Sequence, residues 1–380
     1  MNLSPIKSML PPWASRIQPY PTGKPIEEVE RELGRSAVKL ASNENPLGPS
    51  PRALEAIRQS LDRVHLYPDS AGYGLRRKLA ELLQLEMKHL ILGAGSTELI
   101  ELAAKTFLSG GDQGIASESS FLIYRLAIQE AGAGLALVPL RGMTIDLAAI
   151  RQAVTPRTKL VFLANPNNPT GTLFTASEFD TFLDALPAHV LVVLDEAYYD
   201  YAPPGYSRSL DLVRSGRNVL VLRTFSKVYG LAGLRLGYAC GHPELIENLN
   251  RVRAPFNTSR PAQAAALAAI EDREHVGRSV ELNSEEMRFV TEELTFLGIR
   301  FTPSHANFLL IDTARDCEQD FLRLLEEGVI VRPMKVYGFP TSLRVTIGTH
   351  PDNERFLLAI RQITRFPASV SSQSSGFWRR

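Results

Sequence analysis

From about residue 89 onward, short apolar runs alternate with segments whose apolar residues recur every three or four positions. The runs are HLILG, GIAS, LALVPL, KLVFLA, HVLVVLDE and NVLVLRT. Between them lie SSFLIYRLAIQEAGA, LAAIRQAV and ASEFDTFLDAL, which have the spacing of amphipathic helices. This alternation predicts an α/β fold, in which a mostly parallel sheet is covered by helices on both faces. Ligands of such sheets bind at the carboxyl ends of the strands, so a site is expected just after these runs.

A second region, with a different pattern, makes up the C-terminal third of the chain. A long Ala- and Glu-rich stretch at roughly 261–297 predicts helix, and the runs IRFT, NFLLID, GVIVRP and SLRVTIG predict strands with helices between them. Since 380 residues exceed the size at which one core usually divides, we expect a large domain at 41–255 and a smaller α+β domain at 256–366. Residues 1–40 are expected to dock on the small domain, and the Ser-rich tail at 367–380 is expected to be disordered.

The composition limits the partners that this chain is expected to have. Lysine and arginine total 42 against 41 for aspartate and glutamate, and the net charge of +1 gives no reason to expect nucleic acid or an anionic membrane as a partner. No window approaches the roughly 18 uninterrupted apolar residues of a membrane span, and the start of the chain lacks the apolar core of a signal peptide. Cys240 and Cys317 lie far apart without a CxxC motif, as is typical of buried thiols in a reducing compartment. We therefore expect a cytoplasmic protein.

The run HVLVVLDEAYY places Asp195 at the end of a predicted central strand. A buried carboxylate there is costly to desolvate unless a cation meets it, which favours a binding role. A strand-end acid at a helix cap is an equally good interpretation of this motif alone. The same pattern occurs in P-loop ATPases, but these need GxxxxGK followed by Ser or Thr, and the only Gly-Lys pair here, Gly23-Lys24, is followed by proline. The ATPase interpretation is therefore excluded.

Two further motifs follow predicted strands. In LGAGSTELIELAAKTF (residues 92–107), glycines follow a predicted strand and an amphipathic helix is predicted to begin at Ser96. The free amide groups and the dipole at the start of this helix suit a phosphate. The GxGxxG fingerprint would need glycine at Glu98, so the motif resembles a dinucleotide site only loosely, and an N-cap after a tight turn explains it as well. In ANPNNPTG (residues 164–171) Asn168 precedes proline, which keeps it out of the helical region and lets its amide point into a cleft. The chain contains no HExxH, GxSxG or Cys/His ligand spacing, so no metal site is predicted.

The stretch RTFSKVYGLAGLRLGY (residues 223–238) surrounds Lys227 with groups that can bind an anion. A lysine amine has a pKa of about 10.4, so it becomes a nucleophile at pH 7 only where burial or nearby cations lower that pKa. Thr224, Ser226 and Arg235 supply hydroxyl and guanidinium donors suited to a phosphate. An aldehyde that carries a phosphate, with a ring nitrogen that needs a buried carboxylate, is pyridoxal 5′-phosphate. The sequence therefore predicts a Schiff-base lysine for this cofactor.

An ordered series of motifs between about residue 20 and residue 366 resembles the class I/II aminotransferases of the pyridoxal-phosphate-dependent fold type I. The motifs are ASNENPLGPS, LYPD, GAGSTELI, NPNNPTG, LDEAYYD, TFSKVYGLAGLRLGY, ANFLLID, VIVRPM and LRVTIGTHPDNERF. The resemblance implies a large domain with a mostly parallel seven-stranded sheet flanked by helices, a smaller α+β domain, and a homodimer in which the two subunits share each site.

The resemblance assigns cofactor roles to residues that match the family motifs. Lys227 would form the Schiff base and carry the proton between the substrate Cα and the cofactor C4′, while Asp195 would keep the pyridinium nitrogen protonated. Tyr198 and Asn168 would donate to the phenolic oxygen of the cofactor, and Asn168 would also contact the substrate. The residues that would hold the cofactor phosphate are Gly95, Ser96, Thr97, Thr224, Ser226, Arg235 and the partner subunit's Tyr67.

Other residues match the family's contacts to the substrate and to the cofactor ring. Arg344 would pair with the substrate α-carboxylate through its planar guanidinium, and Tyr20 and Arg332 would bind the substrate's own phosphate. Phe121 stands where the family usually has a tyrosine that stacks on the ring, and Ser119 replaces the expected proline, so the stacking would remain without the phenol. Without the resemblance, both arginines lie on strand-like segments where structural ion pairs are common.

The activity implied by the resemblance is transamination in two half-reactions. An amino donor, expected to be glutamate, would load the cofactor with an amino group, which imidazole-acetol phosphate would then accept to give histidinol phosphate, a step of histidine biosynthesis. Relatives with the same motifs act on aromatic amino acids, and others decarboxylate an O-phospho amino acid, so both reactions remain alternatives. A regulator that kept the fold and the cofactor is a further class, but such proteins carry an added DNA-binding domain, for which this chain has no room.

Overall fold

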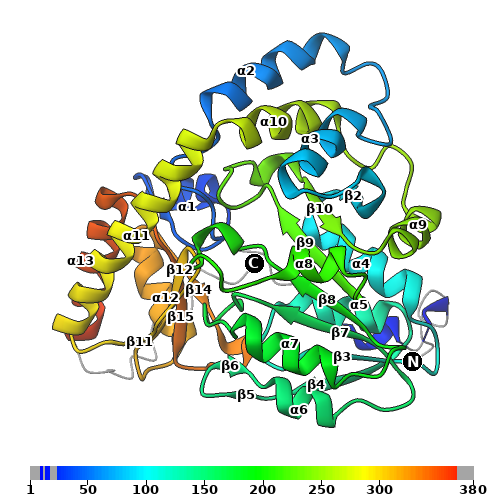
Figure 1. Ribbon diagram of the computed structural model, residues 1–380. Helices are drawn as coiled ribbons and strands as arrows, with labels where there is room; N and C mark the ends of the chain where they lie inside the picture. The colour runs from blue at the N-terminus through cyan, green and yellow to red at the C-terminus, as the bar shows by residue number, and fades with distance from the viewer. Residues whose placement is uncertain (1–8, 12, 18–23, 366–380) are drawn as a thin grey trace.

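The computed structural model describes residues 9–11, 13–17 and 24–365 of the 380-residue chain. The tail expected at 367–380 and the candidate residue Tyr20 lie outside the described residues. The described part of the chain builds two main sheets, each covered by its own helices (Figure 1).

The larger sheet of the described part has seven strands and confirms the predicted α/β fold. In spatial order the strands are β2 (Leu90–Gly93), β10 (Gly237–Cys240), β9 (Val219–Thr224), β8 (Leu191–Asp195), β7 (Thr158–Ala164), β3 (Gln113–Ser117) and β4 (Gly134–Val138). Neighbouring strands are parallel except at β10, which runs antiparallel to both β2 and β9. The mostly parallel arrangement is thus confirmed, and the carboxyl ends of β7, β8 and β9 meet at one edge of the sheet.

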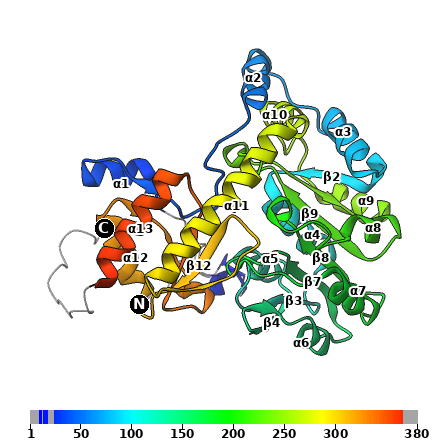
Figure 2. The same cartoon turned by 60° about the vertical axis from the view of Figure 1, so that its left-hand side comes forward.

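Alternate residues of the central strands are buried on opposite faces of this sheet, which is why their sequences are almost continuously apolar. On β8, Val192 and Leu194 join one core, whereas Leu191 and Val193 join the other. The helices on the first face are α3 (Tyr73–Leu83), α6 (Leu147–Gln152), α7 (Ala176–Asp184), α8 (Ser209–Arg214) and α10 (Arg260–Glu271). Those on the second are α4 (Gly95–Phe107), α5 (Leu122–Glu130) and α9 (Pro243–Val252). Helix α2 (Pro51–Ser60) packs on α10 at the outer side of this part of the molecule (Figures 1 and 2).

The smaller sheet is antiparallel and carries both arginines expected to bind the substrate. In spatial order its strands are β11 (Arg300–Thr302), β12 (Phe308–Asp312), β15 (Ser342–Thr346) and β14 (Arg332–Pro333). The helices that share its apolar core are α11 (Arg273–Phe296), α12 (Cys317–Glu326) and α13 (His350–Arg365). Arg332 lies opposite Arg344 in the pairing of β14 with β15, so the two side chains begin from neighbouring positions.

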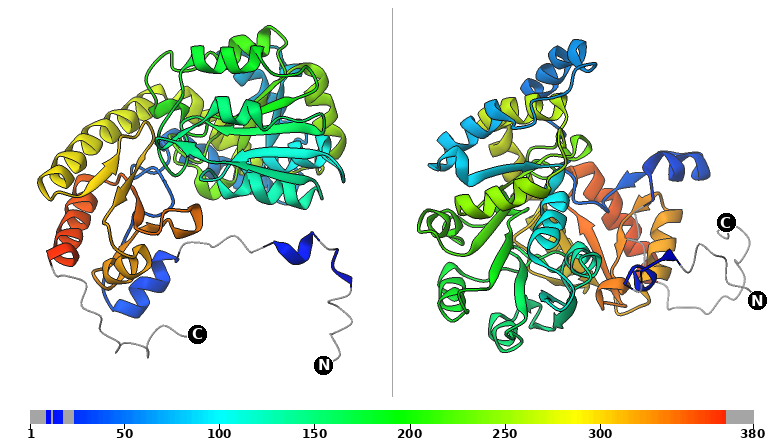
Figure 3. Two further views of the ribbon diagram at one scale, coloured as in Figure 1. Left: turned by 90° about the horizontal axis from the view of Figure 1, so that it is seen from below. Right: turned by 90° about the vertical axis from the view of Figure 1, so that its right-hand side faces the viewer.

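Two short strand pairs lie outside the main sheets. They are β5 (Leu140–Arg141) with β6 (Thr144–Ile145), and β1 (Val38–Lys39) with β13 (Val329–Ile330). The second pair ties the N-terminal part of the chain to the segment that leads into the small sheet. Helix α1 (Ile26–Leu33) lies beside α12 (Figure 3), and its Val29 packs with Leu325 and Ile330. The Leu40 N–H then donates to the Ile330 carbonyl at 2.7 Å. Residues 41–45 continue from this point and contact both the small sheet and the loop after β9.

The helical stretch expected at roughly 261–297 is two helices rather than one. Helix α10 ends at Glu271 and α11 begins at Arg273, because Asp272 between them adopts φ −90° and ψ 69°. The Asp272 carboxylate accepts a hydrogen bond from the His275 N–H and so caps the first turn of α11. The longer of the two helices, α11, runs from the small sheet toward the large one (Figure 2).

Two properties of the described residues bear on the cellular setting. Cys240 and Cys317 are both buried and unbridged, as their spacing predicted. None of the described helices combines the length and the apolar character that crossing a bilayer requires.

Candidate active site

The strand ends of the large sheet face the small sheet across a cavity of about 300 Å³. Its wall combines the ends of β8 and β9, the start of α4, the loop after β7, the segment after β1, and strands β14 and β15. The residues proposed from the sequence that line this cavity are Ser96, Thr97, Phe121, Asn168, Asp195, Tyr198, Thr224, Ser226, Lys227, Arg235, Arg332 and Arg344. The fold therefore brings these side chains together from distant parts of the chain.

Asp195 is the last residue of β8 and is almost completely buried. Its Oδ2 accepts a hydrogen bond from the Tyr124 hydroxyl at 2.8 Å, and its Oδ1 accepts one from the Ala197 N–H at 3.1 Å. Burial raises the pKa of this carboxyl to about 6, although both hydrogen bonds and the charge of Lys227 favour the ionised form. A cation placed against Asp195 within the cavity would therefore stabilise the carboxylate.

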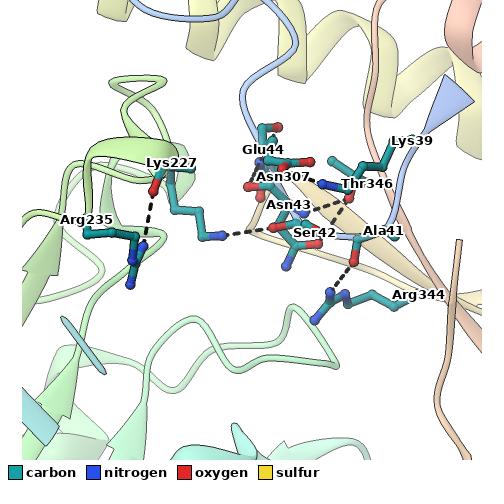
Figure 4. A network of polar contacts seen from close by, with 11 residues as sticks. Lys39, Ala41, Ser42, Asn43, Glu44, Lys227, Arg235, Asn307, Arg344 and Thr346 are labelled. Atoms are coloured by element: carbon teal, nitrogen blue, oxygen red, sulfur yellow. Dashed lines mark hydrogen bonds and ion pairs between the residues drawn. The ribbon is translucent and has the colours of Figure 1, made fainter. Parts of the chain in front are cut away.

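Lys227 follows β9, and its amine lies inside the cavity. Nζ donates to the backbone carbonyl of Ser42 at 3.1 Å (Figure 4). Burial, together with the positive charges of Arg344 and Arg235, lowers the pKa of this amine to about 7. A large fraction of the Lys227 amine is thus neutral near pH 7, as a nucleophile for an aldehyde must be, and the direction of the shift is the one that the sequence predicted.

The start of α4 and the loop after β9 form an anion-binding corner. Gly95 has φ +80°, and a Cβ added to it would lie 2.6 Å from Nη2 of Arg235, so only glycine lets the guanidinium come this close to the helix. The next residue, Ser96, belongs to the first turn of α4, whose backbone N–H groups have no partner within the helix. On the other side, the Ser226 N–H donates to Thr224 Oγ1 at 3.1 Å, which fixes both hydroxyl residues at the cavity wall.

Among the described residues, Arg344 has no partner for the structural ion pair that its strand position suggested. Its Nη1 donates to Asn168 Oδ1 at 2.6 Å. Its Nη2 donates to the Ala41 carbonyl at 2.7 Å, as Figure 4 shows. Because a guanidinium can only donate, the Asn168 oxygen faces Arg344 and its NH₂ group faces away. That orientation leaves the amide free to act as the donor that the family motif implies.

The charge on the cavity wall is strongly unbalanced. Among the described lining residues, Lys227, Arg235, Arg332 and Arg344 are basic, and Asp195 supplies the one carboxylate. The buried Nε of Arg344 has no hydrogen-bond partner within the described structure. Since buried donors normally have partners, this wall is suited to ligands with several negative groups. Pyridoxal 5′-phosphate fits these residues, because its phosphate matches the anion-binding corner and its ring nitrogen matches the buried carboxylate of Asp195.

Besides Gly95, which supports the anion-binding corner without lining the cavity, two of the proposed residues are not placed at the cavity of this chain. Tyr67 is 79% exposed, and its ring stacks on that of Phe256 with the centroids 4.6 Å apart. Arg260 Nη2 donates to the Tyr67 carbonyl at 2.9 Å and holds the backbone of this loop. Tyr20 is the other, since it lies outside the described residues.

Sequence reasoning missed three polar residues of the cavity wall: Ser42, Asn43 and Tyr124. Ser42 and Asn43 belong to the ASNENP motif, which the resemblance included without assigning a role to either residue. Tyr124 lies on α5 among apolar neighbours, where its spacing indicates a core position and gives no sign that its hydroxyl meets Asp195. The helical spacing of apolar residues can place a tyrosine inside the fold, but its hydrogen-bond partner on another element depends on tertiary packing.

Known proteins resemble this chain over most of its length. The family model described as aminotransferase class I and II matches residues 35–360. The chain is 50% identical over 350 residues to the histidinol-phosphate aminotransferase of Moorella thermoacetica, with 91% of each chain covered. It is 51% identical over 359 residues to that of an Anaeromyxobacter species, with 93% of this chain and 99% of the relative covered. The crystal structure of histidinol-phosphate aminotransferase from Sinorhizobium meliloti in complex with pyridoxal-5′-phosphate superposes with a TM-score of 0.87 at 28% identity, covering 94% of this chain and 98% of that one.

Proposed function

The chain belongs to the class I and II aminotransferases, and we propose that it is the transaminase that interconverts histidinol phosphate and imidazole-acetol phosphate. 2-Oxoglutarate and glutamate would be the other substrate pair. A reaction that forms histidinol phosphate would be a step of histidine biosynthesis. The names of the relatives at about 50% identity support this assignment. The observation that carries it in the structure is the pair Arg332 and Arg344, which line the cavity beside Lys227 and can bind a substrate anion in addition to the cofactor phosphate.

We propose that the cofactor, pyridoxal 5′-phosphate, is held by side chains from several elements. When bound, it supplies an aldehyde that takes up the substrate's amino group and a ring that accepts the electron pair released at the substrate Cα. Asp195 would keep the ring nitrogen protonated, and Phe121 would cover one face of the ring. The residues assigned to the phosphate are Gly95, Ser96, Thr97, Thr224, Ser226, Arg235 and Tyr67 of the partner subunit.

Lys227 is proposed to move the proton of the reaction. Because the pKa of its amine is near 7, Nζ can accept a proton from the substrate Cα and return it within the same site. Tyr198 and Asn168 would orient the cofactor by donating to its phenolic oxygen. The hydrogen bond from Arg344 to Asn168 Oδ1 supports this role, because it leaves the Asn168 NH₂ group as the free donor.

Recognition of the substrate is proposed to rest on the small sheet. The planar guanidinium of Arg344 is suited to a carboxylate, and its two Nη groups are already aligned by Asn168 and the Ala41 carbonyl. Arg332, on the neighbouring strand, is assigned to the substrate's own phosphate together with Tyr20. The mostly buried position of both arginines would strengthen these ion pairs, since water screens them little.

We further propose that the protein is a homodimer in the cytoplasm. Exposed apolar side chains on and after α2 support the dimer, because a surface of this kind is suited to a second copy of the chain. Tyr67 lies in the same region, and the partner subunit's Tyr67 would reach the cofactor phosphate. The two unbridged, buried cysteines agree with a reducing compartment.

The chain is also proposed to divide into a large domain at 41–255 and a small domain at 256–366, with residues 1–40 docked on the latter. The separate cores of the two main sheets support two domains, although residues 262–270 of α10 pack in the core of the large sheet. The packing of Val29 against Leu325 and Ile330 supports docking of the N-terminal part.

A single-turnover experiment tests the proposed reaction. The cofactor-loaded protein is mixed separately with histidinol phosphate, glutamate and phenylalanine, and loss of the visible cofactor absorbance is followed. We expect histidinol phosphate and glutamate to react. Reaction with phenylalanine alone would indicate an aromatic aminotransferase, and release of carbon dioxide from an O-phospho amino acid would indicate a decarboxylase. If no amine changes the absorbance, the assignment as a transaminase is wrong.

A further inference from the structure

Asn43 occupies an unusual position for a residue that sequence reasoning left without a role. It is 1% exposed, and its backbone has φ +56°, a conformation that asparagine tolerates better than most residues. Its N–H donates to Thr346 Oγ1 at 2.9 Å, and Asn307 Nδ2 donates to its carbonyl at 3.1 Å (Figure 4). These contacts fix the backbone of Asn43 against the small sheet.

The side-chain amide of Asn43 has a defined orientation. Thr346 Oγ1 accepts from the Asn43 N–H, so the proton of this hydroxyl is available for Asn43 Oδ1, which lies 3.2 Å away. The amide oxygen therefore faces Thr346, and Nδ2 faces the hydroxyl of Tyr198 at 2.8 Å. An NH₂ group can only donate, so the Tyr198 oxygen is the acceptor in this bond and its own proton points away from Asn43.

The same short segment also holds the two cations nearest to the proposed chemistry. The Ala41 carbonyl accepts from Arg344 Nη2, and the Ser42 carbonyl accepts from Lys227 Nζ. Tyr198 lines the same cavity, with its ring centroid 5.7 Å from Lys227 Nζ. Three consecutive residues thus contact the amine, the phenol and the guanidinium; Figure 4 shows the contacts to the amine and the guanidinium.

We propose that Asn43 is a positioning residue that makes Tyr198 a hydrogen-bond donor to the cofactor. By occupying the phenol oxygen as a donor, the Asn43 amide leaves the Tyr198 proton for the phenolic oxygen of pyridoxal 5′-phosphate. This inference rests on the proposed function. A donor at that oxygen stabilises its anionic form, so it lowers the pKa at which the visible absorbance of the loaded protein changes with pH.

Substituting Asn43 tests the direction of the hydrogen bond. Asn43→Asp replaces the donor by an acceptor of the same shape, so the Tyr198 proton would turn toward position 43 and away from the cofactor. We expect the pKa of the absorbance change to rise by about one unit, close to the rise caused by Tyr198→Phe. Asn43→Gly removes the side chain but keeps the left-handed backbone accessible, and a smaller rise is expected. An unchanged absorbance pKa in both variants would overturn the inference.

The double variant separates an effect through Tyr198 from a general disturbance. In a Tyr198→Phe background, Asn43→Asp should add little further shift, because the phenol through which it acts is gone. An equal shift in both backgrounds would contradict the inference. Asn353→Ala is the matched control, since it removes another buried asparagine whose hydrogen bonds go to Glu286 and Gly348 and not to residues 41–45. It should leave the absorbance pKa within about 0.3 units of the wild-type value.

Failure of this inference is distinguishable from failure of the proposed function. If the wild-type protein takes up no cofactor, the proposed function fails. If the wild-type protein and Tyr198→Phe load normally but neither Asn43 variant does, Asn43 builds the site without orienting the phenol, and the inference alone is wrong. The spectroscopic pKa needs no turnover, so it can be measured even for variants without activity.

Discussion

The two walls of the cavity are built in different ways. The wall at the large sheet consists of residues that end or follow a single strand or lie in the first turn of a single helix, such as Asp195, Lys227 and Ser96. The wall at the small sheet combines Arg344 with the segment at residues 41–43. The hydrogen bond from Arg344 to the Ala41 carbonyl joins positions 303 residues apart in the chain. The first wall is determined by strand register, whereas the second exists only after the two sheets and the N-terminal part have packed together.

This difference suggests a division of labour between the walls. Groups held by the central strands have little freedom to move, which suits side chains that must meet reacting atoms in one geometry. Groups on the small sheet can shift with that sheet, which suits recognition of substrates of different shape. We therefore expect substitutions at the large sheet to impair every substrate alike and substitutions at the small sheet to alter the preference between substrates.

The largest effect is expected from Asp195→Asn. An amide cannot stabilise the protonated ring nitrogen, so kcat should fall by about 10²- to 10³-fold for histidinol phosphate and for glutamate alike. Steady-state kinetics with both substrates measures this. A loss below about tenfold, or a loss confined to one substrate, would remove the proposed distinction between the walls.

Arg344→Lys and Arg332→Lys should have smaller effects, and each should raise the KM of a different substrate. Lysine retains the charge but not the planar pair of donors, so each variant should raise one KM by about 10- to 100-fold. Arg344→Lys should affect glutamate more, and Arg332→Lys should affect histidinol phosphate more. The two variants serve as controls for each other, and equal changes for both substrates in both variants would show that the arginines do not divide the recognition.

In the cofactor-free protein, Asp195→Asn should stabilise the fold at neutral pH. The pKa of Asp195 is about 6 in the folded state against 3.8 for the unperturbed group, so the folded protein binds the extra proton and its free energy of unfolding falls as pH rises through this window. Replacing the carboxyl should remove this penalty, which is at most about 3 kcal/mol at pH 7, and should change little at pH 3.5. Urea unfolding between these two pH values measures the difference. A destabilised variant at pH 7 would contradict the account of Asp195 as a carboxylate that lacks a cation until the ligand binds.

The smallest effect is expected from Tyr67→Phe. Loss of one hydrogen bond from the partner subunit's Tyr67 to the cofactor phosphate should weaken cofactor binding by about three- to tenfold. The effect should disappear at protein concentrations low enough to separate the subunits, which cofactor titration over a dilution series would show. If the wild-type protein and Tyr67→Phe bind the cofactor equally at every protein concentration, Tyr67 does not reach the site.

The residues that could be predicted from the sequence are those on the first wall. Asp195 and Lys227 each follow an uninterrupted apolar run, and the strand-end rule for α/β sheets then places them at one edge without knowledge of any tertiary contact. The large sheet itself was predictable for the same reason, because its strands are buried on both faces and read as apolar runs.

The remainder depends on contacts between distant positions. Asn43 bonds to Tyr198 and Thr346, which lie 155 and 303 residues away, and the two-residue strand before it has no periodic pattern to reveal its direction. Tyr124 was predictable as a core residue of a helix, but its bond to Asp195 joins α5 to β8 through tertiary packing. The break at Asp272 was missed because the flanking helices share one apolar pattern, although an aspartate that caps a helix start is a recognisable signal.

Identifying the lysine that bonds to the cofactor tests the central claim most directly. The protein is loaded with pyridoxal 5′-phosphate, reduced with borohydride to make the bond permanent, digested, and mapped by mass spectrometry. In the wild-type protein, the structure predicts one modified residue per chain, Lys227. In Lys227→Ala, it predicts no stable modification at any other lysine. A modified lysine elsewhere in the wild-type chain, or a protein that remains unmodified after loading and reduction, would contradict the account.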